Sequence, residues 1–387
     1  MTNVYLNHAA TSFPKPRAVM EAVVRWFEQP PVDAARGGDA GCDPVTPCRQ
    51  QFAQLLGVTD PGRVVLLPSA THALNLVVAG LAAPGSHVVT SVLEHNSLLR
   101  PLAHRERDHG VAVSYLGVDE EGMIDPGQLV RALRPHTSLV ALCHASNVTG
   151  TILPIDALAK IAREREILFI VDAAQTAGCL PIDVIRTGVD VLCFTGHKSL
   201  LGPQGTGGFY IRKGLENILP PLMRGGTGSA SESEEQPDFL PDKFESGTPN
   251  AIGLAGLGAG IRFVIDTGIE HIREKEVRLT RRFLEGAARL PGITIYGPCE
   301  AAHRTAVVSF NLNGFTPSDL ASGLDEEFGL LSRPGLHCSP AAHRTIGTFP
   351  QGTLRFSFGF FNTEAEIQTG LEALAYLSRK YHNKKRR

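Results

Sequence analysis

A lysine at the end of an apolar strand is the first residue of this sequence that could do chemistry. Lys198 lies three residues beyond the apolar run 190–195, with His197 before it and a glycine-rich turn at 202–208 behind it. In open α/β sheets, ligands bind outside the carboxyl ends of the strands. An amine at that place could bond covalently to a carbonyl group. Taken alone, Lys198 also fits a surface lysine in a loop, so its neighbours must decide.

Polar residues follow the ends of other predicted strands as well. Ala70 and Thr71 follow the run 64–67 and open a helix, whose free N–H groups and dipole suit a phosphate, although simple helix capping is the alternative. Asp172 follows the apolar run 167–171, where it could cap a helix or pair with a buried cationic nitrogen. His95 and Asn147 follow two further strands. Five such strand ends are hard to explain as five independent caps.

One cofactor chemistry uses this whole set. Pyridoxal 5′-phosphate (PLP) needs a lysine for covalent attachment and an acid that keeps its pyridine nitrogen protonated. It also needs a phosphate cup and a flat group that stacks on its ring. The sequence offers these in the order phosphate cup, His95, Asn147, Asp172 with Gln175, and Lys198. We therefore predict a PLP site at the carboxyl edge of a sheet.

The elements that position these residues alternate between strand and helix. From about residue 17 to 261, apolar runs alternate with helical patterns such as 71–81 and 155–164, which is typical of a parallel α/β sheet. The predicted strands are 64–67, 87–92, 111–116, 138–143, 167–171, 190–195 and 208–211. They predict a large, mostly parallel, seven-stranded sheet.

The pattern changes towards the C-terminus. Residues 225–241 are acidic and rich in glycine and serine, which predicts a loop. A long charged helix (269–289), strands at 305–312 and 353–358, and a terminal helix (364–380) then indicate a smaller α+β domain. We assign residues 15–255 to a large PLP-binding domain, and residues 1–14 and 256–387 to the small domain.

Composition is that of an ordinary globular enzyme. The 387 residues suggest two domains, and hydrophobic and charged residues make up 43% and 20%. A net charge of −2 gives no electrostatic reason to expect a nucleic-acid or membrane partner, and no apolar stretch approaches membrane-spanning length. The first residues do not resemble a signal peptide, and seven cysteines without a CxxC pair favour a reducing cytoplasm over disulfides or a structural zinc site.

The motifs around these residues resemble a known superfamily. The stretches "NHAATSFPKP", "ATHALN", "EHNS", "SNVTGT", "VDAAQTAG", "TGHKSLLGPQGTGG", "ESGTPN", "RPGLHCSP" and "GTLRFSFGFFNT" span nearly the whole chain. They resemble the fold type I, class V aminotransferase superfamily, and within it the cysteine desulfurases and selenocysteine lyases. The resemblance implies a fold type I PLP-dependent transferase that acts on a small amino acid, L-cysteine or L-selenocysteine.

The resemblance also implies catalytic roles, position by position. Lys198 would carry the covalent bond to PLP, and Asp172 would pair with the pyridine nitrogen. Gln175 would hydrogen-bond to the ring hydroxyl, and His95 would stack over the ring and help to move protons. An absorption band of the bound cofactor would test this reading.

Further residues would hold the phosphate and the substrate. The resemblance assigns the phosphate to Ala70, Thr71, Thr195 and His197, together with Thr248 of the neighbouring subunit, so a homodimer is implied. Asn147, Arg333 and Arg355 would bind the substrate carboxylate. Arg355 suits this role because its planar guanidinium can make a bidentate pair with a carboxylate.

Cys338 decides what the site would do to its amino acid. It lies in a glycine- and proline-flanked loop with Arg333 and His337 beside it, and cationic neighbours favour a nucleophilic thiolate. In cysteine desulfurases a loop cysteine at this place attacks the substrate sulfur, takes it up as a persulfide and releases alanine. The persulfide could then be passed to a sulfur-acceptor protein or released as sulfide.

The other cysteines have different surroundings. Cys143 and Cys193 lie within apolar strands and are predicted core residues, whereas Cys179 and Cys299 lie in connecting segments without a charged cluster around them. Cys42 falls in a stretch that lies near the active site in relatives, so it is a minor candidate.

Other functions stay open, because the sequence departs from the family pattern at one position and because other enzymes share the fold. Leu336 stands where the second subgroup of desulfurases typically has the first of two histidines, which leaves the sulfur acceptor open. A selenocysteine lyase, another C–S lyase or an aminotransferase would use the same fold. A nucleotide-binding protein is a weak alternative, because "GPQGTGG" lacks the G-x-G-x-x-G spacing and runs into a strand.

Overall fold

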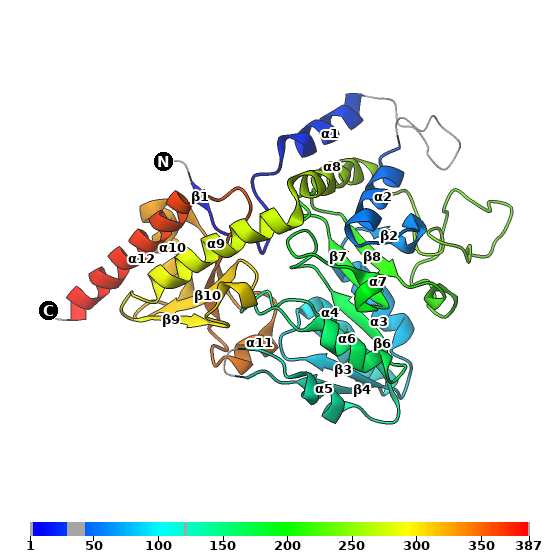
Figure 1. Cartoon of the computed structure of the whole chain (residues 1–387), viewed down its shortest axis with the longest axis horizontal. Coiled ribbons are helices and arrows are strands. Elements are labelled where there is room, and N and C mark those ends of the chain that lie inside the picture. The colour runs from blue at the N-terminus through cyan, green and yellow to red at the C-terminus, as the bar shows by residue number, and fades with distance from the viewer. Residues whose placement is uncertain (1–2, 29–42, 120–121, 386–387) are drawn as a thin grey trace.

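A seven-stranded sheet forms the centre of this computed structural model, which describes residues 3–28, 43–119 and 122–385. Its strand order is β2-β8-β7-β6-β5-β3-β4, and β8 alone runs antiparallel to its neighbours within this sheet (Figure 1). The strands are β2 (Val64–Leu67), β3 (His87–Ser91), β4 (Ala112–Leu116), β5 (Thr137–Cys143), β6 (Leu168–Asp172), β7 (Val191–Thr195) and β8 (Gly207–Ile211). All seven predicted strands are confirmed, with ends that match or differ by one residue.

Helices cover both faces of this sheet because alternate strand residues point to opposite sides. In β6, Phe169 and Val171 pack in one hydrophobic cluster and Ile170 packs in the other. The first cluster lies under α2 (Val45–Leu55), α5 (Pro126–Ala132), α6 (Ile155–Arg163), α7 (Val184–Thr187) and α8 (Ala251–Thr267). The second lies under α3 (Ala70–Leu81) and α4 (Asn96–His109). Burial on both faces explains why the strands are nearly continuous apolar runs.

Two glycines allow the turns at the carboxyl edge of the sheet to approach each other. Gly178 has a φ of +99°, and a Cβ there would lie 2.5 Å from the carbonyl oxygen of Ser199. A Cβ on Gly207 would lie 2.8 Å from the backbone of Ser69. The glycine-rich turn after Lys198 therefore serves close backbone packing against the start of α3.

A second, antiparallel sheet lies to one side of the first, as Figure 1 shows. Its order is β12 (Arg333–Gly335), β13 (Thr353–Ser357), β10 (Val307–Leu312) and β9 (Ile293–Tyr296). It packs with the long helix α9 (Ile269–Ala287) and with α10 (Pro317–Phe328) and α12 (Glu364–Lys385). The short helix α11 (Pro340–Thr345) follows β12, and its Ala342 packs in the first cluster of the large sheet. The helices and strands predicted in this region are confirmed, and the segment 225–241 contains no helix or strand, as expected.

The first residues cross between the two parts of the fold. The short strand β1 (Val4–Tyr5) pairs with β11 (Leu330–Leu331), and the chain then runs to α1 (Arg17–Glu28), which packs against α8. Short 3-10 turns lie at Pro61–Arg63, Leu215–Asn217 and Ala301–His303. The domain boundaries stay a prediction, and the one at residue 255 falls within α8, whose Leu257 and Ile261 pack in the large core.

None of the described helices is by itself long and apolar enough to cross a membrane. Helices α8 and α9 meet that test of length and composition only together, as a pair bent by 82°.

Candidate active site

One cavity of about 230 Å³ gathers the predicted site residues at the carboxyl edge of the large sheet. Every predicted site residue except Cys338 and Thr248 lines it. The predicted site residues that line the cavity are Ala70, Thr71, His95, Asn147, Asp172, Gln175, Thr195, His197, Lys198, Arg333 and Arg355. The parallel strand ends bring residues from distant parts of the sequence together, and the small sheet closes the cavity with its two arginines.

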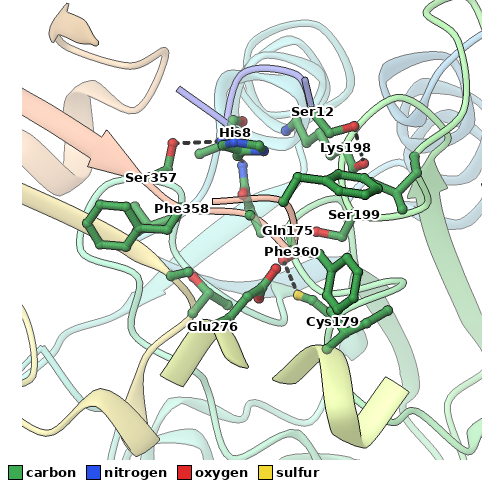
Figure 2. A pocket seen from close by; sticks show the side chains of 18 residues that line it. His8, Ser12, Gln175, Cys179, Lys198, Ser199, Glu276, Ser357, Phe358 and Phe360 are labelled. Atoms are coloured by element: carbon green, nitrogen blue, oxygen red, sulfur yellow. Dashed lines mark hydrogen bonds between the residues drawn. The ribbon is translucent and has the colours of Figure 1, made fainter. Parts of the chain in front are cut away.

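Lys198 is held by its backbone while its amine is left unpaired. Its carbonyl oxygen accepts a hydrogen bond from Ser12 Oγ at 2.8 Å, an interaction drawn in Figure 2. The neighbouring carbonyl of His197 accepts from Lys15 Nζ at 2.8 Å and from Thr11 Oγ1 at 3.1 Å. The Lys198 amine has no hydrogen-bond partner among the residues that the structure describes. Burial lowers its pKa to about 8, against a smaller opposing effect of Asp172.

Asp172 ends β6 and is buried in the cavity wall. Its Oδ1 accepts a hydrogen bond from the backbone N–H of Ala174 at 2.9 Å, so the carboxylate does stabilise the following turn. Burial raises its pKa, and the N–H of Ala174 and the charge of Lys198 partly offset that effect. A carboxylate in so dry a place gains from a cationic partner. Beside it, Gln175 Nε2 donates to the carbonyl of Ala9 at 3.2 Å.

The start of helix α3 forms one end of the cavity. Ser69 caps the helix by accepting from His72 N at 3.2 Å, and the N–H groups of Ala70 and Thr71 have no intrahelical acceptor because they lie in the first turn. Thr71 Oγ1 and Ser97 Oγ lie 2.7 Å apart at the same end. His197 Nδ1 is buried without a partner among the described residues. Unpaired donors at a helix N-terminus favour a bound phosphate.

His95 lines the cavity and also caps helix α4. Its Nδ1 accepts a hydrogen bond from Ser97 N at 3.1 Å, so in the neutral ring the hydrogen is on Nε2. Burial, together with the nearby Lys198 and Arg333, lowers the pKa of His95 to about 4. The imidazole is therefore neutral at physiological pH. Its predicted roles in stacking and proton movement stay predictions.

Two arginines from the small sheet enter the site side by side. Arg333 in β12 and Arg355 in β13 are paired in register. Arg355 is only 1% exposed, and its guanidinium donates to the carbonyl of Asn147 at 2.8 Å and to Asn7 Oδ1 at 3.5 Å. Burial, with a further effect from Arg333, lowers the pKa of Arg355 to about 9, which leaves it cationic at neutral pH. Two adjacent cations suit an anionic ligand such as a carboxylate.

Asn147 is already engaged in holding a loop. Its Nδ2 donates to the carbonyl of His337 at 2.7 Å, and its Oδ1 accepts from Ser339 Oγ at 2.7 Å. The asparagine thus connects the end of β5 to the residues on either side of Cys338. One amide hydrogen is left for the predicted contact with a substrate carboxylate.

Cys338 lies exposed at the rim of the site. It lines a neighbouring groove of about 500 Å³ between α3 and α4, which shares Thr71, His95 and Ser97 with the cavity. Arg333 Nη2 points at its Sγ at 3.9 Å, and the N–H of Asn96 donates to its carbonyl at 2.8 Å. The thiol is thus accessible, next to a cation and close to the Lys198 cavity.

The surroundings of the other cysteines agree with the sequence analysis at two positions and differ at one. Cys143 and Cys193 are buried core residues, as predicted, although Cys143 also touches the cavity. The expectation that no charged cluster surrounds Cys179 is wrong, because Arg273 and Glu276 of α9 lie close to it. Burial nevertheless raises the pKa of Cys179 to about 12, so this thiol is inert. Cys42 lies outside the described residues.

Thr248 lies away from the cavity, on an exposed turn between two anchors. On one side, Glu245 pairs with Arg49 at 2.7 Å and accepts from Leu66 N at 2.6 Å. On the other, Asn250 caps α8 by accepting from Gly253 N at 3.0 Å. Thr248 does not line the cavity of its own chain, and its contact with a neighbouring subunit stays a prediction.

Residues 4–369 match the sequence model of the family described as aminotransferase class-V. The chain belongs to the class-V aminotransferase family. A probable cysteine desulfurase from Methanothermobacter thermautotrophicus is 34% identical, over 95% of this chain and 92% of the relative, and one from Synechocystis is 32% identical, over 96% and 90%. A solved cysteine desulfurase from Thermococcus onnurineus has a TM-score of 0.91 at 32% identity and covers 98% of this chain and 95% of its own. The solved cysteine desulfurase CsdA from Escherichia coli has a TM-score of 0.87 at 27% identity, and the match covers 97% of this chain and 94% of that one. The predicted fold type I architecture is confirmed.

Members of the class-V aminotransferase family are PLP-dependent enzymes, and the residues of this site fit that cofactor. The unpaired amine of Lys198 can hold its carbonyl carbon, and the helix start at Thr71 with the unpaired His197 Nδ1 can hold its phosphate. Asp172 can hold a proton on its pyridine nitrogen. When bound, PLP would draw electrons away from the bonds to the substrate α-carbon.

Some residues of the site escaped sequence reasoning. Lys15 and Ser12 hold the loop of Lys198, and neither residue type indicates such a role in the sequence. Ser97 joins Thr71 to His95. The quoted motifs contain these residues. The contacts of Ser12 and Lys15 with the Lys198 loop join positions 186 and 182 residues apart, so no local pattern in the sequence predicts them.

Proposed function

We propose that this protein is a PLP-dependent cysteine desulfurase that converts L-cysteine to L-alanine and takes up the sulfur on Cys338 as a persulfide. The observation that carries the proposal is the position of Cys338. Its exposed thiol lies beside the Arg333 guanidinium, at the rim of the cavity that contains the buried amine of Lys198. A family member that only transfers amino groups has no use for a thiol at this place.

The two arginines orient the substrate in this proposal. Arg355 and Arg333 bind its carboxylate, so that the amino group faces Lys198 and the side-chain sulfur points towards the rim. Burial keeps part of the Lys198 amine neutral near its pKa of about 8, so it can accept a proton at Nζ. Asp172 would hold a proton on the pyridine nitrogen of the cofactor through its negative charge.

The sulfur step balances without an outside oxidant. The Cys338 thiolate attacks the substrate sulfur, so an S–S bond forms and the bond between sulfur and the substrate β-carbon breaks. The electron pair of that bond stays with carbon, which takes up a proton and leaves as the methyl group of alanine. Sulfur is oxidised to the persulfide level and carbon is reduced by the same amount.

We also propose a cytoplasmic homodimer that hands its sulfur to an acceptor protein. Thr248, on its anchored surface turn, would complete the phosphate site of the partner subunit. A reducing compartment suits the chain because all six cysteines in the described part are free thiols. The exposed position of Cys338 leaves room for an acceptor to approach.

Product analysis tests the proposed reaction. The holoenzyme is incubated with L-cysteine and a reductant, and alanine, sulfide, pyruvate and ammonia are measured. Alanine and sulfide in equal amounts are expected. Pyruvate and ammonia would instead identify a β-eliminating lyase, and amino-group transfer to an added keto acid would identify an aminotransferase.

A further inference from the structure

We propose that a buried hydrogen-bond chain of Thr348, His343 and His337 positions Cys338 for its attack on sulfur. The inference rests on the desulfurase function proposed above. His343 lies on α11 and Thr348 on the loop after it, and neither lines the cavity. They are therefore positioning residues that act through His337, the residue before Cys338.

The backbone around Cys338 needs such support. His337 and Cys338 have φ angles of 50° and 59°, in the left-handed region that side chains with a Cβ rarely adopt. Two such residues in succession are unfavourable unless the surroundings hold them, and conformations of this kind gather at functional sites. His337 is buried while Cys338 is exposed, so the buried ring is the anchor of the exposed thiol.

The direction of the hydrogen bonds in the chain follows from the chemistry of the groups. His337 Nε2 lies 3.0 Å from the carbonyl oxygen of Arg333, which can only accept, so this nitrogen carries the hydrogen. Burial lowers the pKa of His337 to about 2, so its ring is neutral and its Nδ1 accepts. That Nδ1 lies 3.3 Å from His343 Nε2, which must therefore donate.

The chain ends on a hydroxyl group. His343 is also neutral, because burial lowers its pKa to about 4, and its Nδ1 accepts from Thr348 Oγ1 at 2.7 Å. The bonds thus run in one direction from Thr348 to the carbonyl of Arg333, and Thr348 Oγ1 has the carbonyl of His343 as a second, longer contact at 3.4 Å. A chain of this kind permits one ring orientation at each histidine.

The end point of the chain links it to the chemistry. Arg333 offers its carbonyl to His337 and its guanidinium to Cys338 Sγ, so the same contacts fix the sulfur and the cation beside it. From the other side, Asn147 holds the carbonyl of His337 at 2.7 Å. Loss of the ring chain would free one side of the turn and separate Sγ from Arg333.

Paired variants of His343 test this inference. His343→Leu removes both ring nitrogens, whereas His343→Gln keeps an N–H donor that can reach His337. In His343→Leu, we expect kcat for L-cysteine to fall about 10- to 100-fold with KM within about threefold, as for a misplaced reacting group. The cofactor absorption band should be unchanged. His343→Gln should recover kcat to within about threefold of wild type.

A matched control separates positioning from stability. His87 is also fully buried, and its ring nitrogens contact Thr137 Oγ1 at 2.7 Å and Ser114 Oγ at 2.9 Å, but it begins β3 at the opposite edge of the sheet. His87→Leu should lower the melting temperature without a change in kcat. Equal losses of kcat in His87→Leu, His343→Leu and His343→Gln would overturn the inference.

Alkylation of Cys338 gives a readout that needs no turnover. In His343→Leu and Thr348→Val, iodoacetamide should label the Cys338 peptide at least about threefold more slowly than in wild type, because Arg333 no longer faces the sulfur. Thr348→Val nearly keeps the volume of the side chain and serves if His343→Leu does not fold. Wild-type labelling rates in both variants would contradict the proposal that the hydrogen-bond chain positions Cys338. If wild type makes no alanine, the desulfurase proposal fails. The labelling rates then still decide whether the hydrogen-bond chain positions Cys338.

Discussion

At the scale of single residues, burial sets the chemistry of the site. The cavity wall removes Lys198 and Asp172 from water, which lowers the pKa of the amine to about 8 and raises that of the carboxyl group. Each group is thus less stable in its charged form than in water and gains from a partner of opposite charge. PLP would bond through its carbonyl carbon to the neutral amine, and its protonated ring nitrogen would give Asp172 a partner of opposite charge.

Covalent attachment of PLP tests the role of Lys198. Borohydride reduction of the holoenzyme followed by peptide mapping should label Lys198 alone. Lys15 is a demanding internal control, since burial also lowers its pKa to about 8, but its amine already donates to Ser12 Oγ and the carbonyl of His197. A label on Lys15 or on any other lysine would overturn the assignment.

Asp172→Asn tests the partner of the pyridine nitrogen. The amide keeps the shape of the side chain but removes the negative charge that holds the ring proton. Turnover of L-cysteine should therefore fall by about 100-fold or more, which is the usual effect of removing one electrostatic group from an active site. Cofactor affinity, measured by absorbance titration, should fall as well. Activity near that of wild type would show that another group protonates the ring.

At the scale of elements, the large sheet could be predicted and much of the small one could not. The inner strands of the large sheet are apolar runs because both of their faces are buried, and such runs are visible in the sequence, whereas the edge strand β4 is partly exposed. Strand β12 has three residues, of which two are Pro334 and Gly335, so it carries no strand pattern. The pairing of Arg333 with Arg355 depends on this strand and appears only in three dimensions.

The site shows the same limit. Residues directly at strand ends, such as Asp172 and Lys198, could be predicted because the edge of a parallel sheet gathers them. The role of His343 could not, because its ring acts on Cys338 through a contact with the ring of His337. Sequence spacing gives no measure of such a contact.

Helix α9 brings a buried acid to the junction of the two sheets. Glu276 lies in a small cavity of about 30 Å³ with His8, Cys179 and Lys198, as Figure 2 shows. Burial raises its pKa from 4.5 to about 8, with Arg273 acting in the opposite direction. At neutral pH the folded protein therefore holds a proton that the unfolded chain has released.

Stability against pH tests this property of α9. Glu276 contributes fully below pH 4.5, and its contribution is lost as the pH rises towards about 8, so the free energy of unfolding of wild type should fall over that range relative to Glu276→Gln. Glu276→Gln removes this dependence and should be more stable than wild type at pH 8, by about 1 kcal/mol or more. Denaturation of both proteins at pH 5 and pH 8 measures the effect. The exposed neighbour Glu274→Gln should behave like wild type at both pH values, and an unstable Glu276→Gln at pH 8 would contradict the account.

At the scale of the whole molecule, an apolar face supports the proposed dimer. Met20, Val24 and Phe27 lie on one side of α1, and they are 63%, 54% and 71% exposed. Exposed apolar residues that cluster in this way indicate a contact surface. The predicted contribution of Thr248 to the partner's phosphate site requires the same assembly.

Phe27→Glu tests whether this face holds two copies together. A buried charge at the interface should raise the dimer dissociation constant at least about tenfold, as measured by sedimentation, and PLP should be retained less well. Tyr115→Glu is the control, because Tyr115 is 46% exposed on β4 in a different part of the fold. A monomeric wild type with full cofactor occupancy would remove both the dimer and the role of Thr248.

Sulfur on Cys338 is the central claim, and mass spectrometry of the holoenzyme after brief exposure to L-cysteine tests it most directly. The Cys338 peptide should gain about 32 Da, the mass of one sulfur atom, and lose it again on reduction. Cys338→Ala should keep the cofactor spectrum but make no alanine from cysteine, while Cys299→Ala, which removes the other exposed cysteine of the described residues, should behave like wild type. An unmodified Cys338 peptide in wild type, together with undiminished alanine production by Cys338→Ala, would contradict the account.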